Sequence, residues 1–289
     1  MLERDNDLAG FTDQDVEDVV QEEMGLAMAK YQARPHPVAI LLAGQPGAGK
    51  TELSSMLIHG LGGNAVFING DDYRRFHPHY RELYRVFGSD SVQMMSPFSN
   101  RVTERLIDEF SNRGVNMVIE GTGRTVEVPR STAELLTRKG YTVEMAVIAV
   151  KPEISLISTL RRFYQMNERG TIPRATAISA HDAIVDVLPG NLDRLNSLPS
   201  IVRLSIWDRE MCPLFDSRSD VGILPSEVLR GYWDSSWTVE ELQQAKKDIG
   251  DLREQEDQNR LGQSAAIDEL AQRIDAVEMQ AQSFGQPLL

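Results

Sequence analysis

The sequence predicts an α/β fold, in which a parallel sheet is sandwiched by helices and both ends of the chain carry helical extensions. Three observations support this prediction. Short apolar segments alternate with helical segments through the middle of the chain, a glycine-rich loop follows the first apolar segment, and polar helical segments precede and follow this core. We expect an N-terminal helical segment (1–36), an α/β domain (37–212), and an irregular linker with a C-terminal helical tail (213–289).

The first predicted helix covers Phe11–Tyr31. Thr12 can cap its N-terminus, with Asp15 three residues later, and three valines recur on one face. The run Arg34–Pro37 then ends the helix, because proline removes a backbone donor.

Five strands are expected to alternate with five helices after this break. The strands are predicted at Val38–Ala43, Ala65–Ile68, Asn116–Ile119, Thr142–Val150 and Ile201–Trp207. The first helix follows the glycine-rich loop and ends at Leu61, and the others are predicted at Val102–Phe110, Thr132–Lys139, Ile154–Gln165 and Thr176–Leu195. Apolar strands that alternate with helices indicate a parallel sheet covered on both faces.

The last part of the chain is expected to be irregular from Phe215 to Trp237 and helical beyond it. Two apolar seams recur at helical spacing, one at Leu242, Ile249 and Leu252 and the other at Ile267, Leu270, Ile274 and Val277. We favour helices that lie on the domain's own surface. The alternative is a coiled-coil or partner-binding arm.

Composition excludes several classes of protein. The hydrophobic fraction of 41% and charged fraction of 25% are those of an ordinary globular protein. A net charge of −13 argues against binding to nucleic acid or to an anionic membrane. Met1–Gly10 has no apolar leader, Val38–Ala43 is too short to cross a bilayer, and the single cysteine, Cys212, fits a reducing compartment. We expect a cytoplasmic protein.

The glycine-rich loop carries the most specific chemistry. It matches the phosphate-binding (P-loop) pattern at Gly44, Gln45, Pro46, Gly47, Ala48, Gly49, Lys50 and Thr51. Glycines let backbone N–H groups surround a phosphate, and the following helix adds its positive end. Lys50 is expected to reach the β and γ oxygens of ATP, and Thr51 to offer a hydroxyl to Mg²⁺. The fold expected around the loop is a P-loop kinase-like sheet.

A triphosphate site alone does not choose among kinases, ATPases, GTPases and motors. No base-reading N-K-x-D box is present, which argues against a GTPase. The strand ending at Glu120 is followed by Gly121-Thr-Gly-Arg124. A carboxylate and polar groups at a strand end suit a polar substrate better than a bare metal site.

Asp71 and Asp72 follow the second strand, at the same expected edge of the sheet. A kinase needs a carboxylate that accepts the proton of the attacking hydroxyl, and Asp71 is the candidate. The other interpretation, equally weighted, is that one of the two caps the next helix.

Arginines gather at Arg161, Arg162, Arg169 and Arg174. In an acidic chain this favours a mobile segment that closes over phosphates, although a solvated basic helix face is the alternative. The neighbouring His181–Asp182 pair is interpreted as structural.

These motifs together resemble the zeta toxin family, the kinase half of the epsilon/zeta and Pez toxin–antitoxin systems. The resemblance runs from about Ala39 to Leu204. Its stretches are the loop Gly44–Thr51, Asp71–Pro78, Pro97–Arg101, Val118–Arg124, Arg174–Thr176 and His181–Asp182.

The resemblance implies a kinase that uses ATP and Mg²⁺ to phosphorylate a sugar hydroxyl of UDP-N-acetylglucosamine, which blocks peptidoglycan synthesis. It also implies a small helical antitoxin as partner. Lys50 and Thr51 would hold phosphate and metal, Asp71 would be the base, and Arg162 and Arg174 would clamp the transferring phosphate. The positions that match the sugar-nucleotide pocket are Glu104, Glu120, Thr122, Arg124 and Thr132.

Two other functions stay open. The acceptor could be another small hydroxylated metabolite or an antibiotic, or the chain could be a non-catalytic nucleotide-binding regulatory module. A further hypothesis is that the acidic N-terminal helix enters the nucleotide site as an antitoxin does.

Overall fold

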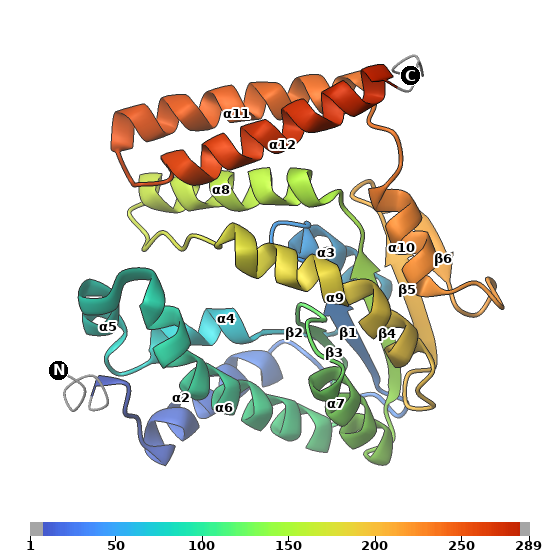
Figure 1. The fold of residues 1–289 in the computed structure, drawn as a ribbon. Coiled ribbons are helices and arrows are strands. Elements are labelled where there is room, and N and C mark those ends of the chain that lie inside the picture. Colours follow the sequence, from blue (N-terminus) through green and yellow to red (C-terminus); the bar gives the residue numbers. More distant parts are fainter. Residues whose placement is uncertain (1–7, 284–289) are drawn as a thin grey trace.

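The computed structural model describes residues 8–283 and contains one six-stranded sheet flanked by helices (Figure 1). The strand order is β2-β3-β1-β4-β5-β6, and only β6 runs antiparallel to its neighbour. The strands are β1 (Val38–Ala43), β2 (Val66–Asn69), β3 (Met117–Glu120), β4 (Thr142–Ile148), β5 (Arg203–Trp207) and β6 (Pro213–Asp216). The helices are α2 (Asp13–Met28), α3 (Lys50–Gly60), α4 (Gly70–Tyr73), α5 (Tyr80–Phe87), α6 (Ser91–Asn112), α7 (Glu127–Arg138), α8 (Pro152–Glu168), α9 (Ile178–Asn196), α10 (Pro225–Trp233), α11 (Val239–Asn259) and α12 (Ser264–Ser283).

The predicted α/β fold is confirmed, and all five predicted strands are present with small shifts at their ends. Two predictions were wrong. The segment from Phe215 to Trp237 is not irregular, because it contains the end of β6 and all of α10. Helix α6 begins at Ser91 rather than Val102 and continues through Pro97. The domain limits drawn from the sequence stay a prediction.

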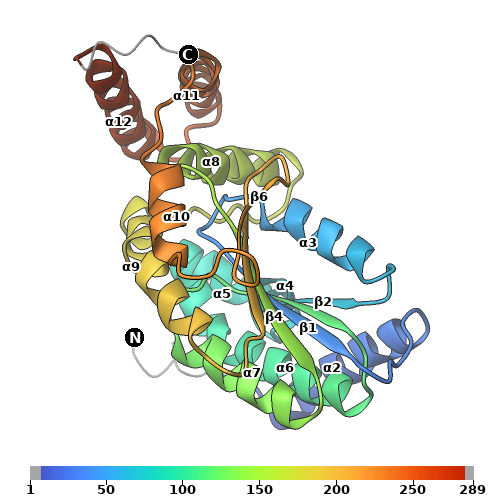
Figure 2. The ribbon, with the colours of Figure 1, turned by 90° about the vertical axis from the view of Figure 1, so that its right-hand side faces the viewer.

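The sheet separates two apolar layers, and β1 shows why. Ala39, Leu41 and Ala43 pack into the larger cluster with α2, α6, α7, α9 and α10. Ile40 and Leu42 point to the other face, into a smaller cluster with α3. Figure 2 shows α3 on one side of the sheet and α7, α9 and α10 on the other. Strand side chains alternate between faces, so a strand covered on both sides is apolar throughout.

The N-terminal helix α2 belongs to the larger cluster. Thr12 caps it as predicted, since its hydroxyl accepts from the Asp15 N–H while Asp15 accepts from the Thr12 N–H. Two of its acidic side chains pair with arginines of α6, since Asp13 lies 2.9 Å from Arg101 and Glu17 lies 3.1 Å from Arg105. These contacts give no support to the hypothesis that the helix enters the nucleotide site.

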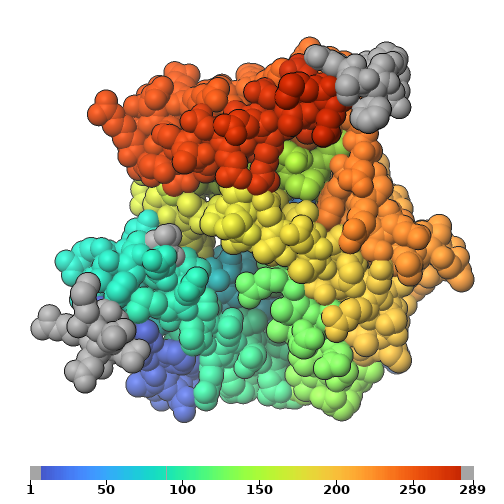
Figure 3. Space-filling model, in the orientation of Figure 1, coloured from blue at the N-terminus to red at the C-terminus, as the bar shows by residue number. Residues whose placement is uncertain are grey.

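The C-terminal helices α11 and α12 form an antiparallel pair that covers α8 (Figures 1 and 3). They enclose a second apolar cluster, separate from the sheet, with Leu160, Phe163 and Tyr164 of α8 at its centre. The predicted seams of the tail lie in this cluster, so the helices rest on the domain's own surface as favoured from the sequence. No helix between residues 8 and 283 is long and apolar enough to span a membrane.

One carboxylate holds the turn between α11 and α12. Glu256 accepts hydrogen bonds from the Tyr164 hydroxyl at 2.7 Å and from the N–H groups of Leu261, Gly262 and Gln263 at 3.1, 2.8 and 3.1 Å. Although burial opposes ionisation, these bonds hold the pKa of Glu256 below its ordinary value. The turn is therefore tied directly to α8.

Candidate functional site

Three strand ends bring the predicted chemistry together. Leu42 of β1 and Asn69 of β2 both stand opposite Glu120 of β3 in the parallel register. The glycine-rich loop leaves β1 just after Leu42, and Asp71 follows β2 by two residues. Because parallel strands end at one edge, the loop, Asp71 and Glu120 meet there, as the sequence predicted.

The loop between β1 and α3 has the conformation of a phosphate cradle. Gly47 has φ +77°, and a Cβ added there would lie 2.1 Å from the carbonyl oxygen of Ser155. Only glycine fits such a position. Gln45 is fully buried and donates from Nε2 to Val150 O at 2.7 Å, which fixes the start of the loop. The loop leads into the N-terminus of α3 at Lys50, where helix N–H groups favour anions.

Lys50 lies along the inside of this loop. Its Nζ donates to Gly44 O at 3.0 Å and to Gln45 O at 3.3 Å, and it lies 3.8 Å from Glu120 Oε1. The side chain is 10% exposed. Such an ammonium is well placed to meet phosphate oxygens that enter the loop.

Burial and neighbouring charges shift the pKa values of Lys50 and Glu120 in opposite directions. Burial lowers the pKa of Lys50, opposed by Glu120 and Asp71, while the charge of Arg162 adds to the lowering. Burial likewise raises the pKa of Glu120, with Lys50 opposing and Asp71 and Asp72 adding to the rise. Charges with little solvent around them act strongly on one another. A negatively charged ligand in the loop would therefore favour the charged form of Lys50 and offset the effect of burial.

Asp71 is not the cap of α4. Asn69 caps this helix, because its side chain accepts from the Asp71 N–H at 3.1 Å. The Asp71 carboxylate instead lies 2.6 Å from Arg74 Nη2, which fixes its direction, and it is about half exposed. The interpretation of Asp71 or Asp72 as the cap was therefore wrong, and the Asp71 carboxylate is accessible to a substrate.

The segment after β3 is held by a residue that the sequence did not single out. Asn191 of α9 donates to Gly123 O and to Arg124 O, both at 2.9 Å. Gly123 has φ +73°, and a Cβ there would meet Leu188 Cδ1 at 2.6 Å. Thr122 accepts from the Arg124 N–H at 3.3 Å. The Arg124 side chain is consequently exposed beside the strand end.

The arginines predicted to close over phosphate have different surroundings. The charge of Arg162 lowers the pKa of both Lys50 and Glu120, and its role in closing over phosphate stays a prediction. Arg161 instead lies 3.0 Å from Asp248 of α11 and serves the fold. Arg174 is half-buried in the irregular segment between α8 and α9.

That segment is attached to α5, because the Tyr84 hydroxyl donates to Pro173 O at 3.0 Å. Glu104 is exposed on α6, next to Thr103, whose hydroxyl lies close to the start of α4. Thr132 is half-buried on α7. Among the described residues, no side-chain hydrogen bond or ion pair ties the side chain of Glu104 or of Thr132 to the site, so their assignment to it stays a prediction. Figure 3 shows that the surface of the molecule is hollowed between the cyan, green and yellow segments.

Arg209 is a second residue that the sequence did not single out. It follows β5 and donates to Gly47 O at 2.5 Å, to Ala48 O at 3.3 Å and to Ser158 Oγ at 2.8 Å. One guanidinium thus holds the glycine-rich loop against α8. The only signal in the sequence was its position just beyond the end of a strand.

Replacing Arg209 by methionine is expected to weaken nucleotide binding by about tenfold or more, because hydrogen bonds from a charged donor contribute about 1.5–3 kcal/mol. Calorimetric titration with ADP measures this. Arg130→Met, at an exposed position of α7, is the matched control. Equal affinities of the two variants would contradict a role for Arg209 in holding the loop.

The arrangement supplies the parts of a phosphoryl-transfer site. The loop and Lys50 can hold a polyphosphate, and the hydroxyl of Thr51 at the start of α3 suits a hard cation such as Mg²⁺. Asp71 can accept a proton from an alcohol nearby. Glu120, Thr122 and Arg124 offer polar groups to a second substrate.

Comparison with known proteins identifies clear relatives. The Zeta toxin family model matches residues 22–220. Toxin PezT of Streptococcus pneumoniae is 37% identical over 86% of this chain and 99% of its own length. Toxin zeta of Streptococcus pyogenes is 35% identical over 82% of this chain and 83% of its own length.

Solved structures agree with these relatives. A structure of the PezAT chromosomal toxin–antitoxin system of Streptococcus pneumoniae superposes with a TM-score of 0.77 at 35% identity, covering 86% of this chain and 99% of that chain. The complex of AvrRxo1-ORF1 and AvrRxo1-ORF2 with ATP has a TM-score of 0.55 at 14% identity, covering 81% and 79%. The second likeness concerns the fold alone.

Proposed function

The chain belongs to the zeta toxin family, and from this premise we propose that it is an ATP-dependent kinase that phosphorylates a sugar hydroxyl of UDP-N-acetylglucosamine. It acts as the toxin of a toxin–antitoxin system and blocks peptidoglycan synthesis. A small helical antitoxin is its partner. The observation that carries the proposal is the meeting of Lys50, Asp71 and Glu120 at one edge of the sheet beside the glycine-rich loop.

In this proposal the chain holds ATP by its phosphates. The N–H groups of the loop and of the first turn of α3 surround the β-phosphate. Lys50 leaves the carbonyl oxygens of Gly44 and Gln45, which it now contacts, and takes phosphate oxygens in their place. Arg162 and Arg174 neutralise charge on the transferring group. Thr51 holds Mg²⁺, which screens phosphate charge when it is bound.

The acceptor approaches from the other side of Glu120. Thr122, Arg124 and Glu120 orient the sugar nucleotide, with Glu104 and Thr132 further out. Asp71, aimed by Arg74, accepts the proton of the attacking hydroxyl. Because the carboxylate is part of the chain and already oriented, little reorganisation accompanies transfer.

The test is a product assay. The purified chain is incubated with ATP, Mg²⁺ and UDP-N-acetylglucosamine, and the sugar nucleotide is analysed by mass spectrometry for one added phosphate. A panel of nucleosides, other sugar nucleotides and aminoglycosides runs in parallel. Phosphate on another acceptor only would replace the proposed substrate, whereas ATP binding without transfer to any acceptor would favour a regulatory module.

A further inference from the structure

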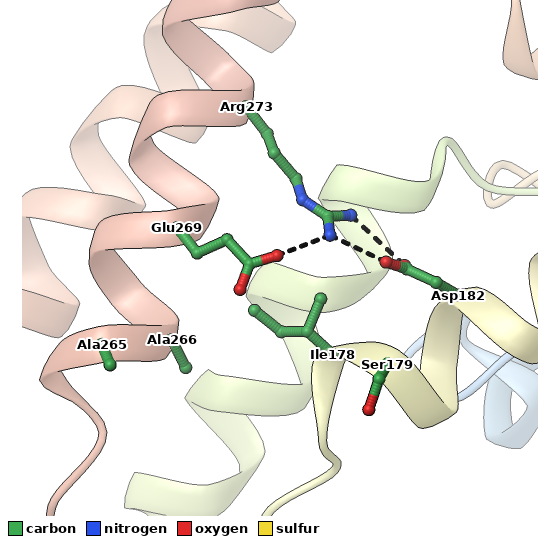
Figure 4. A pocket seen from close by; sticks show the side chains of 7 residues that line it. All are labelled: Ile178, Ser179, Asp182, Ala265, Ala266, Glu269 and Arg273. Atoms are coloured by element: carbon green, nitrogen blue, oxygen red, sulfur yellow. Dashed lines mark hydrogen bonds and ion pairs between the residues drawn. The ribbon is translucent and has the colours of Figure 1, made fainter.

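A chain of polar contacts runs from the glycine-rich loop to the last helix. Gln45 Nε2 lies 3.5 Å from Ser155 Oγ, and Ser155 Oγ lies 2.7 Å from His181 Nε2. His181 Nδ1 lies 3.1 Å from Asp182 Oδ1. Arg273 of α12 donates to both oxygens of Asp182, at 3.3 and 2.7 Å (Figure 4). Five residues from four parts of the chain are thereby connected.

The proton positions along this chain follow from the donors and acceptors available. The Asp182 carboxylate can only accept, so His181 Nδ1 carries a hydrogen. In the neutral ring Nε2 can only accept, so the single hydrogen of the Ser155 hydroxyl has two acceptors within reach, Nε2 at 2.7 Å and Pro152 O at 2.8 Å. Burial lowers the pKa of His181 and so favours this neutral form; Asp182 opposes the lowering, and the charges of Arg273 and Lys50 add to it.

The order Ser155, His181, Asp182 is that of a hydrolytic triad, but it cannot act as one. Ser155 and His181 are both fully buried. The hollow beside them, about 380 Å³ in volume, has Asp182, Glu269 and Arg273 in its wall and neither Ser155 nor His181. No substrate carbonyl can reach the serine, so the chain of contacts holds groups in place.

Ser155 is the point at which these contacts act on the loop. Its carbonyl oxygen occupies the space that a side chain at Gly47 would need, and the same turn of α8 carries Ser158, the partner of Arg209. A shift of Ser155 therefore displaces the loop directly, because packed groups transmit displacement.

We propose that Arg273 is a positioning residue for the glycine-rich loop, acting through Asp182, His181 and Ser155. This inference rests on nucleotide binding at the loop, as in the proposed function. Helix α12 lies beyond residue 220, where the match to the family model ends. Helix α12 thus helps to hold the phosphate site in place through these residues, without contacting the site itself.

Arg273 controls Asp182 and, through it, His181. Although burial opposes ionisation of Asp182, hydrogen bonds from Arg273 and His181 hold its pKa below the ordinary value. Arg273 also contacts Glu269 at 2.7 Å on its own helix. Without the guanidinium, nothing from α12 balances the Asp182 charge, and the proton affinity of His181 rises. A protonated ring donates to Ser155 Oγ instead of accepting, which leaves Pro152 O, at 2.8 Å, as the acceptor of the serine hydroxyl.

The experiment compares Arg273→Met with Arg253→Met, which removes an exposed arginine of α11 paired with Asp268 of α12. ATP affinity is measured by calorimetry at one pH, and the His181 ring is titrated by ¹⁵N NMR. For Arg273→Met we expect ATP binding about fivefold weaker and a His181 pKa above that of the wild type. Arg273→Lys should restore part of both. Arg253→Met should stay within about twofold of the wild type, as expected for an exposed ion pair.

A second variant guards against simple loss of folding. Asp182→Asn keeps an acceptor for His181 Nδ1 but removes the negative charge, so ATP binding weakens while the His181 pKa falls. Opposite shifts in the two variants are not expected from a general loss of structure. Unchanged ATP affinity or an unchanged His181 titration in Arg273→Met overturns the inference, even if the wild type binds ATP. If the wild type does not bind ATP at all, the proposed function fails first and the inference with it.

Discussion

Replacing Lys50 by methionine is expected to reduce phosphoryl transfer by about 10³-fold, the upper range for loss of one preorganised stabilising group. Methionine nearly matches the length of the lysine stem, so packing is retained. The Lys50 side chain is 10% exposed, and burial lowers its pKa. A lysine whose pKa is lowered on folding opposes folding wherever the unfolded chain is protonated. The variant should therefore unfold at a temperature no lower than that of the wild type.

Single-turnover transfer and thermal unfolding measure the two effects separately. Lys246→Met is the control, since Lys246 lies on α11, paired with Glu278. Transfer by the Lys50 variant within about tenfold of the wild type would contradict the assignment of the loop as the phosphate site. A large drop in unfolding temperature would mean that Lys50 serves the fold instead.

Replacing Asp71 by asparagine is expected to reduce the rate of transfer by about 10²- to 10⁴-fold, the usual contribution of a positioned general base. ATP binding should change little, because the residue lies on the acceptor side of the site. Asparagine keeps the size and the contact with Arg74 but accepts protons poorly. The loss should therefore appear in the rate constant for transfer rather than in nucleotide affinity.

Asp72 is the matched control because it is adjacent, also exposed and equally charged. The charges of both residues act on Glu120, and that of Asp71 also acts on Lys50. Asp72→Asn should retain transfer within about threefold, as for a surface charge. If the two variants lose activity equally, the pair acts through its charge and Asp71 is not the base.

The sequence could predict the parts of the fold that depend on local signals. Strand β1 and the loop after it combine an apolar run with glycines whose positive φ angles have no substitute. The first half of α6 was missed because Pro97 normally interrupts a helix, whereas here it lies within one. Strand β6 was missed because its four residues, of which only Phe215 is fully buried, show no clear alternation.

The residues of the site likewise divide into those that the sequence could predict and those that it could not. Lys50, Asp71 and Glu120 were predictable, because the ends of parallel strands meet at one edge. Arg209 and Asn191 were not, since each donates to backbone carbonyls far away in the sequence. A carbonyl oxygen is present at every residue, so no pattern of side chains marks such a contact.

The separate apolar cluster beneath α11 and α12 has a consequence for local stability. A pair of helices with its own small core can open without breaking the sheet, so its amide hydrogens should exchange with solvent as one group and faster than those of β1 and β4. Helix α8 packs against this pair of helices on one side and against the glycine-rich loop on the other. By linkage, bound ATP should slow amide exchange in α11 and α12, which hydrogen–deuterium exchange mass spectrometry would detect. ATP binding at the glycine-rich loop would then change the amide exchange of the C-terminal helices, which are far from the loop in sequence.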